Sequence, residues 1–149
     1  MKKITKLSLL VAGLMLGAQA FAGGIGYIDY VKVQENYPLA QQAIKEIDAK
    51  ALEIQQFMVD KEKQYKALDT PLKKQNFEET TAKELQMREE SLMKLKNQKE
   101  ELVYSRIKEA ANKVLVEQHL DAIIDYRVMF VGGVDVSDQV IQKLKTVAK

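Results

Sequence analysis

Residues 65–77 read YKALDTPLKKQNF and contain Pro71, one of only two prolines in the 149-residue chain. On either side of this proline, residues 39–70 and 72–131 contain neither proline nor glycine. Both runs are rich in Ala, Leu, Glu, Gln, Lys and Met, which favour helix. A residue that precedes proline is pushed out of the helical region, so the first helix must end before Pro71. The sequence therefore predicts two long helices that reverse direction near residues 69–72.

Each of these helices begins at a proline. Pro38 and Pro71 suit a first helical turn, where the missing N–H is not needed, and either Asp69 or Thr70 can cap the second helix. A narrow stripe with steps of three and four residues, typical of a coiled coil, marks the first helix. It consists of Ile44, Ile47, Ala51, Ile54, Met58, Lys61, Tyr65 and Leu68. We expect an antiparallel coiled-coil α-hairpin over residues 38–118.

The stripe of the second helix is less regular. Its leucines keep the coiled-coil spacing, but Arg88 and Lys99 fall on the same stripe. The apolar positions then move by one residue and continue as Val103, Ile107, Ala110 and Val114.

The remaining residues, 23–37 and 119–149, predict a small β-rich body with a C-terminal helix. Ile25 and Tyr27 alternate in a first strand, and the apolar side chains of residues 124–130 alternate in a second strand. Gly132 and Gly133 predict a turn. Ser137 is expected to cap the last helix, whose buried side would consist of Val140, Ile141, Leu144 and Val147. The fold class predicted is α+β and mainly α.

This body is too small to be stable alone. Together its two segments have fewer than about 50 residues, and the chain has no cysteine for disulfides. Strands with open edges can pair between copies of the chain, so we predict self-association through the body. The expected oligomerisation residues are Ile25, Tyr27, Ile28, Ile123, Ile124, Tyr126, Val128 and Phe130.

Residues 1–22 have the pattern of a secretory signal peptide. A basic start, MKKITK, precedes an apolar run over residues 7–18 and the small-residue cleavage pattern Ala20-Phe21-Ala22. The apolar run is shorter than the ~20 residues that cross a bilayer. Removing three of the 23 Lys and Arg residues leaves 20, against 21 Asp and Glu. We therefore expect an exported, soluble, periplasmic protein without the basic surface that nucleic-acid binding needs.

The sequence offers little for catalysis. His119 is the only histidine, and its position suits a left-handed residue after a helix better than a catalytic base. Asp125, Asp135 and Asp138 lack the spacing of an EF-hand. Gly132-Gly133 lacks the lysine of a phosphate loop. We predict no enzyme activity, no cofactor and no metal site.

Scattered methionine and aromatic residues make the hairpin a candidate binding surface, because methionine adapts to varied partners. Packing between the two helices is the alternative interpretation. It is the stronger one for Met58 and Tyr65, which lie on the stripe, whereas both interpretations stay open for Phe57 and Phe77. The candidate residues are Phe57, Met58, Tyr65, Phe77, Met87 and Met93.

The tip of the hairpin is locally basic. An excess of lysine there could meet anionic lipid headgroups or acidic segments of a partner, or could simply be solvated. The lysines are Lys61, Lys63, Lys66, Lys73 and Lys74.

Two stretches carry a family resemblance: GYIDYVKVQENYPLA at residues 26–40 and DAIIDYRVMFVGGVDVSDQVIQKLK at residues 121–145. With the long hairpin between them, they resemble the Skp/OmpH family of periplasmic chaperones. The resemblance implies a homotrimer in which each chain gives strands to a shared body and one helical arm to a cage. It also implies that unfolded outer-membrane proteins, here called clients, are held between the arms without nucleotide or cofactor. A structural coiled-coil spacer or scaffold of the cell envelope is the alternative function.

Overall fold

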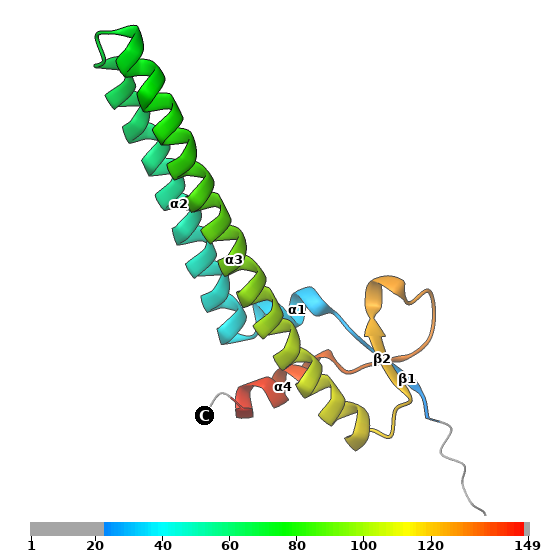
Figure 1. Ribbon diagram of the computed structural model, residues 1–149. Helices are drawn as coiled ribbons and strands as arrows, with labels where there is room; N and C mark the ends of the chain where they lie inside the picture. The colour runs from blue at the N-terminus through cyan, green and yellow to red at the C-terminus, as the bar shows by residue number, and fades with distance from the viewer. Residues whose placement is uncertain (1–22, 148–149) are drawn as a thin grey trace, which may run out of the picture.

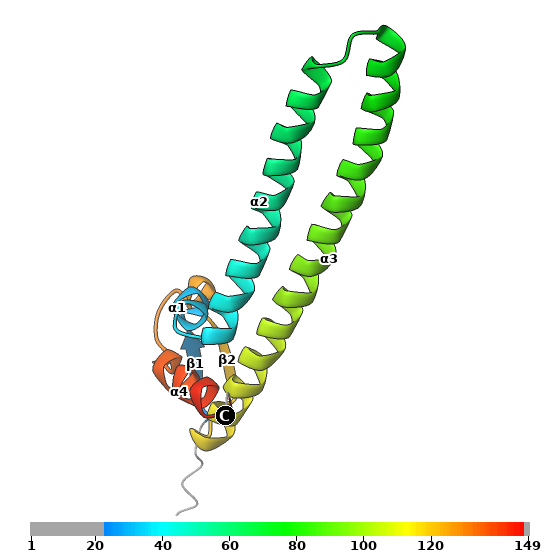
Figure 2. The same cartoon turned by 90° about the vertical axis from the view of Figure 1, so that its left-hand side faces the viewer.

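The computed structural model describes residues 23–147, which form a long helical arm on a small base (Figure 1). The arm is a hairpin of α2 (Pro38–Lys66) and α3 (Pro71–Glu117), which confirms the two predicted helices. At about 1.5 Å per residue, the 29 residues of α2 span about 44 Å and the 47 residues of α3 about 70 Å. Figure 2 shows the two helices side by side from the base to the tip. The longer α3 therefore continues past the start of α2 and into the base.

Side-chain and backbone caps fix both ends of α3. At its start, Thr70 is the capping residue, and its Oγ1 accepts a hydrogen bond from the backbone N–H of Lys73 at 3.4 Å. At its end, the N–H of Leu120 donates to the carbonyl of Leu115 at 2.9 Å, and the N–H of His119 donates to the carbonyl of Val116 at 3.3 Å. This is a Schellman motif. His119 has the left-handed φ of 52° that the motif requires, as predicted.

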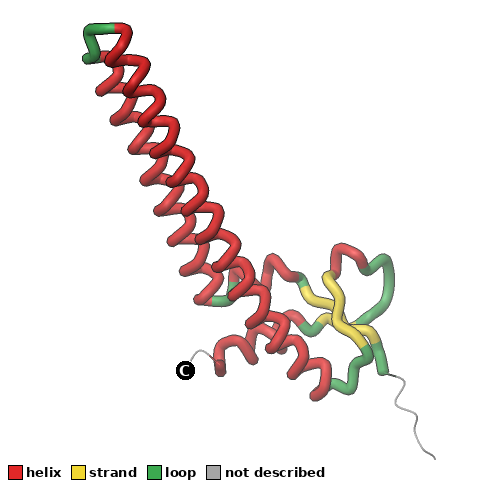
Figure 3. Tube along the Cα trace, viewed as in Figure 1, coloured by secondary structure: helices red, strands yellow, loops and turns green. Residues whose placement is uncertain are grey.

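The base contains a three-stranded sheet, drawn in yellow in Figure 3. The central strand β1 (Ile25–Ile28) pairs in parallel with β2 (Ala122–Asp125) on one side and with β3 (Val134–Asp135) on the other. Ile25 lies opposite Ala122, and Gly26 lies opposite Val134. The sheet therefore joins the first described residues of the chain to two segments that follow the arm.

The predicted strand over residues 124–130 is wrong beyond Asp125. The carboxylate of Asp125 accepts the backbone N–H of Arg127 at 2.9 Å and pairs with the Arg127 guanidinium at 2.6 Å. A side chain that accepts a hydrogen bond from the backbone N–H two residues later competes with strand pairing. The chain consequently turns into the 3-10 helix η1 (Tyr126–Val128) and a loop. Tyr126, Val128 and Phe130 thus lie outside the sheet of their own chain.

Two glycines shape the loop between η1 and β3. Gly132 and Gly133 have φ values of 86° and 80°, which residues with a side chain rarely adopt. A Cβ on Gly133 would also lie 3.2 Å from the carbonyl oxygen of Ile25. At the predicted turn the structure thus has a bend at Val131, followed by two glycines with positive φ.

A short helix, α1 (Tyr30–Glu35), was not predicted. It starts directly after β1 because the Asp29 carboxylate accepts the backbone N–H of Lys32 at 3.1 Å. Asp29 stands in a run that was predicted to be a strand, so its role as a helix cap was not predicted.

The last helix, α4 (Ser137–Val147), begins differently from the prediction. Ser137 is its first residue, and the cap comes from Asp135, whose carboxylate accepts the Ser137 N–H at 2.9 Å and the hydroxyl at 2.6 Å. The fully buried Ser137 hydroxyl also accepts the N–H of Asp29 at 2.9 Å. These bonds tie α4, β3 and the start of α1 together. Val147 lies at the end of the described residues, and its side chain is outside them.

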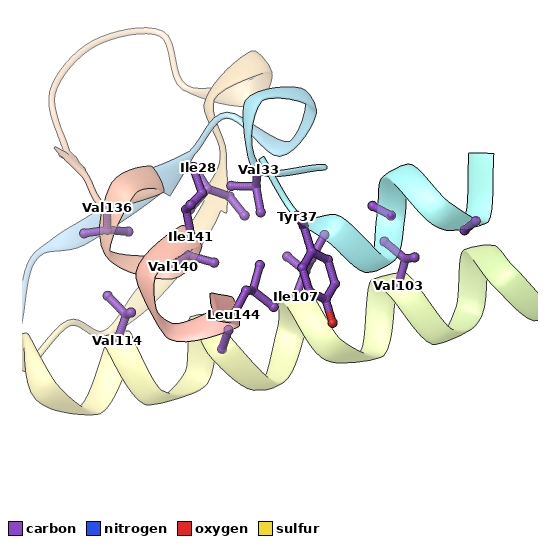
Figure 4. Packing of buried hydrophobic residues seen from close by; sticks show 13 residues of the cluster. Ile28, Val33, Tyr37, Val103, Ile107, Val114, Val136, Val140, Ile141 and Leu144 are labelled. Carbon is purple, nitrogen blue, oxygen red and sulfur yellow. The ribbon is translucent and has the colours of Figure 1, made fainter. Parts of the chain in front are cut away.

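The apolar core is confined to the base (Figure 4). Val103, Ile107, Ala110 and Val114 of α3 are buried, which confirms the displaced stripe. They belong to one cluster with side chains of α2, α1 and α4, and the contact with α4 was not predicted. The expected buried side of α4 is likewise confirmed for Val140, Ile141 and Leu144. The full set is Ile28, Val33, Tyr37, Ala40, Ala43, Val103, Ile107, Ala110, Val114, Val136, Val140, Ile141 and Leu144.

Candidate functional site

The outer arm, defined as residues 44–102, contains no buried residue. Where α2 faces α3, the contact consists of half-buried side chains only. Hydrophobic stabilisation scales with the apolar area that is removed from water, so each of these residues contributes less than a core residue of the base. The outer arm therefore retains much apolar surface in contact with solvent.

One lysine lies at the centre of the contact between the two helices. The Nζ of Lys61 on α2 is 2.7 Å from a carboxylate oxygen of Glu84 on α3. It also lies 5.1 Å from the ring centre of Phe57 and 5.3 Å from that of Phe77. The Arg88 guanidinium covers the Phe57 ring at 4.3 Å. Cation–π contacts and an ion pair thus replace an apolar core in this part of the arm.

The predicted stripe of the first helix is wrong at two of its eight positions. Ile44 and Met58 were placed between the helices, but their exposed fractions are 51% and 43%. Phe57 and Phe77, which lay beside the predicted stripe, are half-buried between α2 and α3 instead. The other six members of the stripe are half-buried as expected: Ile47, Ala51, Ile54, Lys61, Tyr65 and Leu68.

Three of the six candidate binding residues lie together in one groove near the tip. Met58 and Tyr65 come from α2, and Phe77 comes from α3. The groove has a volume of about 450 Å³, and most of its wall is apolar. We call it the apolar groove. Its lining consists of Met58, Lys61, Glu62, Tyr65, Phe77, Glu78, Thr81, Ala82 and Leu85.

The opposite side of the same contact is charged. Helical spacing along α2 puts Glu53 and Asp60 on the side of Lys61 that faces away from Met58. From α3, Arg88 reaches the same side over the Phe57 ring. These residues line a second groove with Gln56, Phe57, Lys61, Gln64 and Glu84. The other candidate binding residues are dispersed. Met87 borders a hollow beside Lys50, and exposed Met93 lies outside these grooves. The structure therefore distinguishes an apolar side of the arm from a charged side.

The predicted basic tip is largely paired with acidic groups. Lys66 bonds Glu62, Lys73 bonds Asp69 at 2.9 Å, and Lys63 is 3.7 Å from Asp60. Lys74 lies over the Tyr65 ring at 5.3 Å. Lys61 is not a tip charge, because it bonds Glu84 inside the contact. Beside these lysines, Leu72 is exposed, and it was not among the predicted binding residues.

The base exposes apolar groups as well. Phe130 is fully exposed, and Val128 and Val131 are largely exposed in the loop after η1. Tyr126 and Ile25 are exposed to nearly half, and Tyr27, Ile123 and Ile124 are half-buried. Ile28 belongs to the core of its own chain. Val131 was missed at the sequence level, although it ends the same apolar run.

A hollow of about 550 Å³ lies in the base between α3, α1 and β2. Its apolar lining comes from Ile28, Ile107, Ala111, Leu115, Ile123 and Ile124. Among the described residues, β2 and β3 each pair with β1 only, so both have an open edge. The base thus combines open strand edges, an exposed loop and an apolar hollow.

Comparison with known proteins identifies the family. Residues 24–144 match the family model described as outer membrane protein (OmpH-like). The chain belongs to the OmpH-like family. The fold of this OmpH-like chain is similar to the crystal structure of a protein from Caulobacter crescentus CB15, described as a proposed outer membrane chaperone (OmpH-like). The TM-score is 0.53 at 11% identity, over 84% of this chain and 85% of the other. No curated protein matches the sequence.

Within residues 23–147, this OmpH-like chain has no helix that is long and apolar enough to cross a bilayer. No group of three or more His, Cys, Asp or Glu side chains gathers around a possible metal position in the same residues. Residues 1–22, which carry the predicted signal peptide, lie outside the described part.

Acid is expected to weaken the fold of this OmpH-like chain. The Lys99 ammonium lowers the pKa of Glu46 from its ordinary 4.5, and hydrogen bonds from Ser137 lower the pKa of Asp135 from 3.8. A carboxyl group whose pKa is lower when folded stabilises the fold above its unfolded pKa, and this effect is lost as the pH falls through the folded pKa. We expect the midpoint of thermal unfolding, followed by circular dichroism, to stay flat above about pH 6 and to fall below about pH 4. A midpoint that rises on acidification would contradict this assignment.

Proposed function

We propose that this OmpH-like chain is an ATP-independent holdase chaperone of the periplasm. It binds unfolded outer-membrane proteins between the helical arms of a homotrimer and prevents their aggregation. The observation that carries the proposal is the outer arm, which spans residues 44–102 without one buried residue and has an apolar groove lined by Met58, Tyr65 and Phe77.

The apolar groove suits a client with alternating apolar side chains. An unfolded β-barrel precursor exposes such side chains and unpaired backbone groups, and both promote aggregation. A shallow groove on each arm provides several weak contacts instead of one tight contact. Weak contacts break and reform readily, so a client can leave for the membrane without nucleotide hydrolysis.

The surface of the base supports the proposed assembly. Strand edges at β2 and β3 are open, and an exposed edge is normally paired or covered. The apolar loop at Val128, Phe130 and Val131 adds surface that a monomeric protein would rarely leave exposed. A neighbouring copy that covers this loop and a strand edge would complete the base. Three copies would then hold three arms around one cavity.

The place of action is proposed from the signal peptide pattern of residues 1–22. At the tip, contact with anionic lipid is proposed to be weak. Lys66 and Lys73 already pair with carboxylates, which reduces the positive charge that a lipid surface would attract. Exposed Leu72 provides the apolar component of such a contact.

Removing the apolar groove should weaken client holding about tenfold. Met58→Ser combined with Leu85→Ser removes two apolar side chains from the wall. Full burial of one such side chain contributes roughly 1.5–3 kcal/mol, but a shallow groove buries each only in part. A loss of about 0.7 kcal/mol for each side chain corresponds to the tenfold effect. The measurement is the turbidity of a diluted, denatured β-barrel protein at increasing concentrations of the mature protein. The matched control is Leu52→Ser, since Leu52 is exposed on α2 outside this groove. If the unaltered protein fails to reduce turbidity, the holdase function is wrong.

A structural spacer is the competing function. Removing seven residues from each helix of the outer arm would shorten a spacer and abolish a distance-dependent role. The same deletion within residues 44–57 and 88–101 would preserve the apolar groove. If the shortened protein still holds clients, the chaperone function is supported. If the Met58→Ser/Leu85→Ser variant and the Leu52→Ser control hold clients equally well, the spacer function is supported.

A further inference from the structure

We infer that the two helices of the arm separate locally near Lys61 while the base stays folded. The separating part, called the distal contact, comprises residues 53–65 of α2 and 77–88 of α3. Its use in binding clients rests on the proposed function, whereas the separation itself does not.

The distal contact depends on charges that salt can screen. Lys61 connects Phe57 on its own helix to Phe77 and Glu84 on α3. Its side chain is only 18% exposed, so one partly desolvated ammonium group replaces the apolar side chain that a stable coiled coil places there. Above Lys61, Tyr65 and Phe77 contact each other at 6.3 Å in a tilted arrangement. Interactions of exposed or half-exposed charges are individually modest and weaken as ionic strength rises.

A buried hydroxyl makes the closed arrangement less favourable. Thr81 Oγ1 on α3 lies in the wall of the apolar groove, is inaccessible to solvent and has no hydrogen-bond partner. A buried polar group without a partner is destabilising, because it has lost its bond to water. Separation of the helices would hydrate Thr81 and remove this penalty. The neighbouring Thr80 differs, since it is exposed and donates to the Asn76 carbonyl at 2.8 Å.

The base limits how far separation extends. Below the outer arm, Val103, Ile107 and Ala110 of α3 are buried and hold the start of α2 and α4 together. Between the distal contact and the base, Lys99 bonds Glu46 across the two helices. Local opening therefore requires the loss of charged and half-buried contacts only, which is typical of the low-stability part of a protein.

Separation would enlarge the apolar groove. Phe57 and Phe77 are half-covered by Lys61 and Arg88 in the closed arm, and both rings become accessible when these contacts break. Client side chains could then insert between the helices rather than lie along them. The two aromatic rings are thus additional binding surface, which stays half-covered in the absence of clients.

Distance measurements between two introduced labels test the separation without any client. The chain contains no cysteine, so cysteines at Lys63 and Glu79 report the distal contact, and cysteines at Lys45 and Glu101 report the arm near the base. Labelled chains are diluted with excess unlabelled chains before pulsed electron paramagnetic resonance. We expect the Lys63–Glu79 distances to gain a longer population that grows about threefold from 0.05 M to 1 M salt, as screening removes the charged contacts. The distances near the base should not change.

Two variants identify the cause. Thr81→Val removes the buried hydroxyl at nearly equal volume and should reduce the open population about tenfold, while the matched Thr80→Val should leave it unchanged. Lys61→Met removes the charge, keeps an unbranched side chain one atom shorter, and should abolish the salt dependence. A single narrow Lys63–Glu79 distance that responds neither to salt nor to Thr81→Val would overturn the inference. If the helices open but Thr81→Val holds clients as well as the unaltered protein, opening does not serve client binding, and the holdase function is unaffected.

Discussion

Replacing Leu144 by alanine is expected to lower the free energy of unfolding by about 3 kcal/mol. Leu144 on α4 is only 2% exposed and belongs to the single described core cluster, which also contains Ile107 and Val114 of α3. Large-to-small substitutions at such positions cost about 2–5 kcal/mol, because the lost contacts leave a cavity. The measurement is urea denaturation followed by circular dichroism at one fixed protein concentration, since the proposed assembly would make stability depend on concentration.

Leu52→Ala is the matched control for this substitution. Leu52 lies on the outer arm with 64% of its surface exposed, so its truncation should change stability by less than about 0.5 kcal/mol. Equal effects of the two substitutions would mean that the stability of the chain does not reside in the base.

A second large effect is expected when Val128 and Phe130 are both replaced by serine. These exposed residues support the proposed trimer, in which each of three equivalent contacts would bury one such loop. If each contact loses roughly 2 kcal/mol of apolar burial, the assembly loses roughly 6 kcal/mol, a factor of about 10⁴ in its association constant. Light scattering should then report the mass of a single chain at micromolar concentration, where the unaltered protein gives three.

Val116→Ser is the control for assembly. Val116 is exposed near the end of α3 and is absent from both the core and the apolar hollow. It should leave the mass unchanged. If the double serine variant keeps the oligomeric mass, the interface lies elsewhere. If it also loses the helical circular dichroism signal, the loop supports the fold itself.

The arm was predictable because its signals are local. Pro38 and Pro71 each start a helix, Thr70 caps α3, and His119 ends it in a left-handed conformation. Each of these effects acts within a few residues of the chain, so no knowledge of the tertiary contacts is needed to infer it.

The face that each helix turns toward the other was predicted less well. Met58 and Phe57 are adjacent, and both fit an apolar stripe within one residue. The choice between them depends on the opposite helix, where Phe77 and Glu84 favour Lys61 and Phe57 at the contact. Consequently the apolar groove could be assembled only from the structure.

The C-terminal part of the base was misjudged for a related reason. Alternating apolar residues after Ile123 favour a strand, but the bonds between Asp125 and Arg127 end it at once. The same bonds turn Val128 and Phe130 into an exposed loop. A pattern of alternating side chains indicates a preference for a strand. It does not show where a polar side chain will bond the backbone N–H groups that strand pairing needs.

The sequence by itself determined the long hairpin, its turn and the small size of the base, since helix propensity, proline and chain length act without distant partners. The sequence already put Lys61 on the stripe, but only the tertiary structure decided that Glu84, Phe57 and Phe77 surround it at the centre of the outer arm. It also decided which apolar side chains the core covers and which remain exposed. The reason is that burial is a property of two surfaces in contact, and the second surface comes from residues far away in the chain.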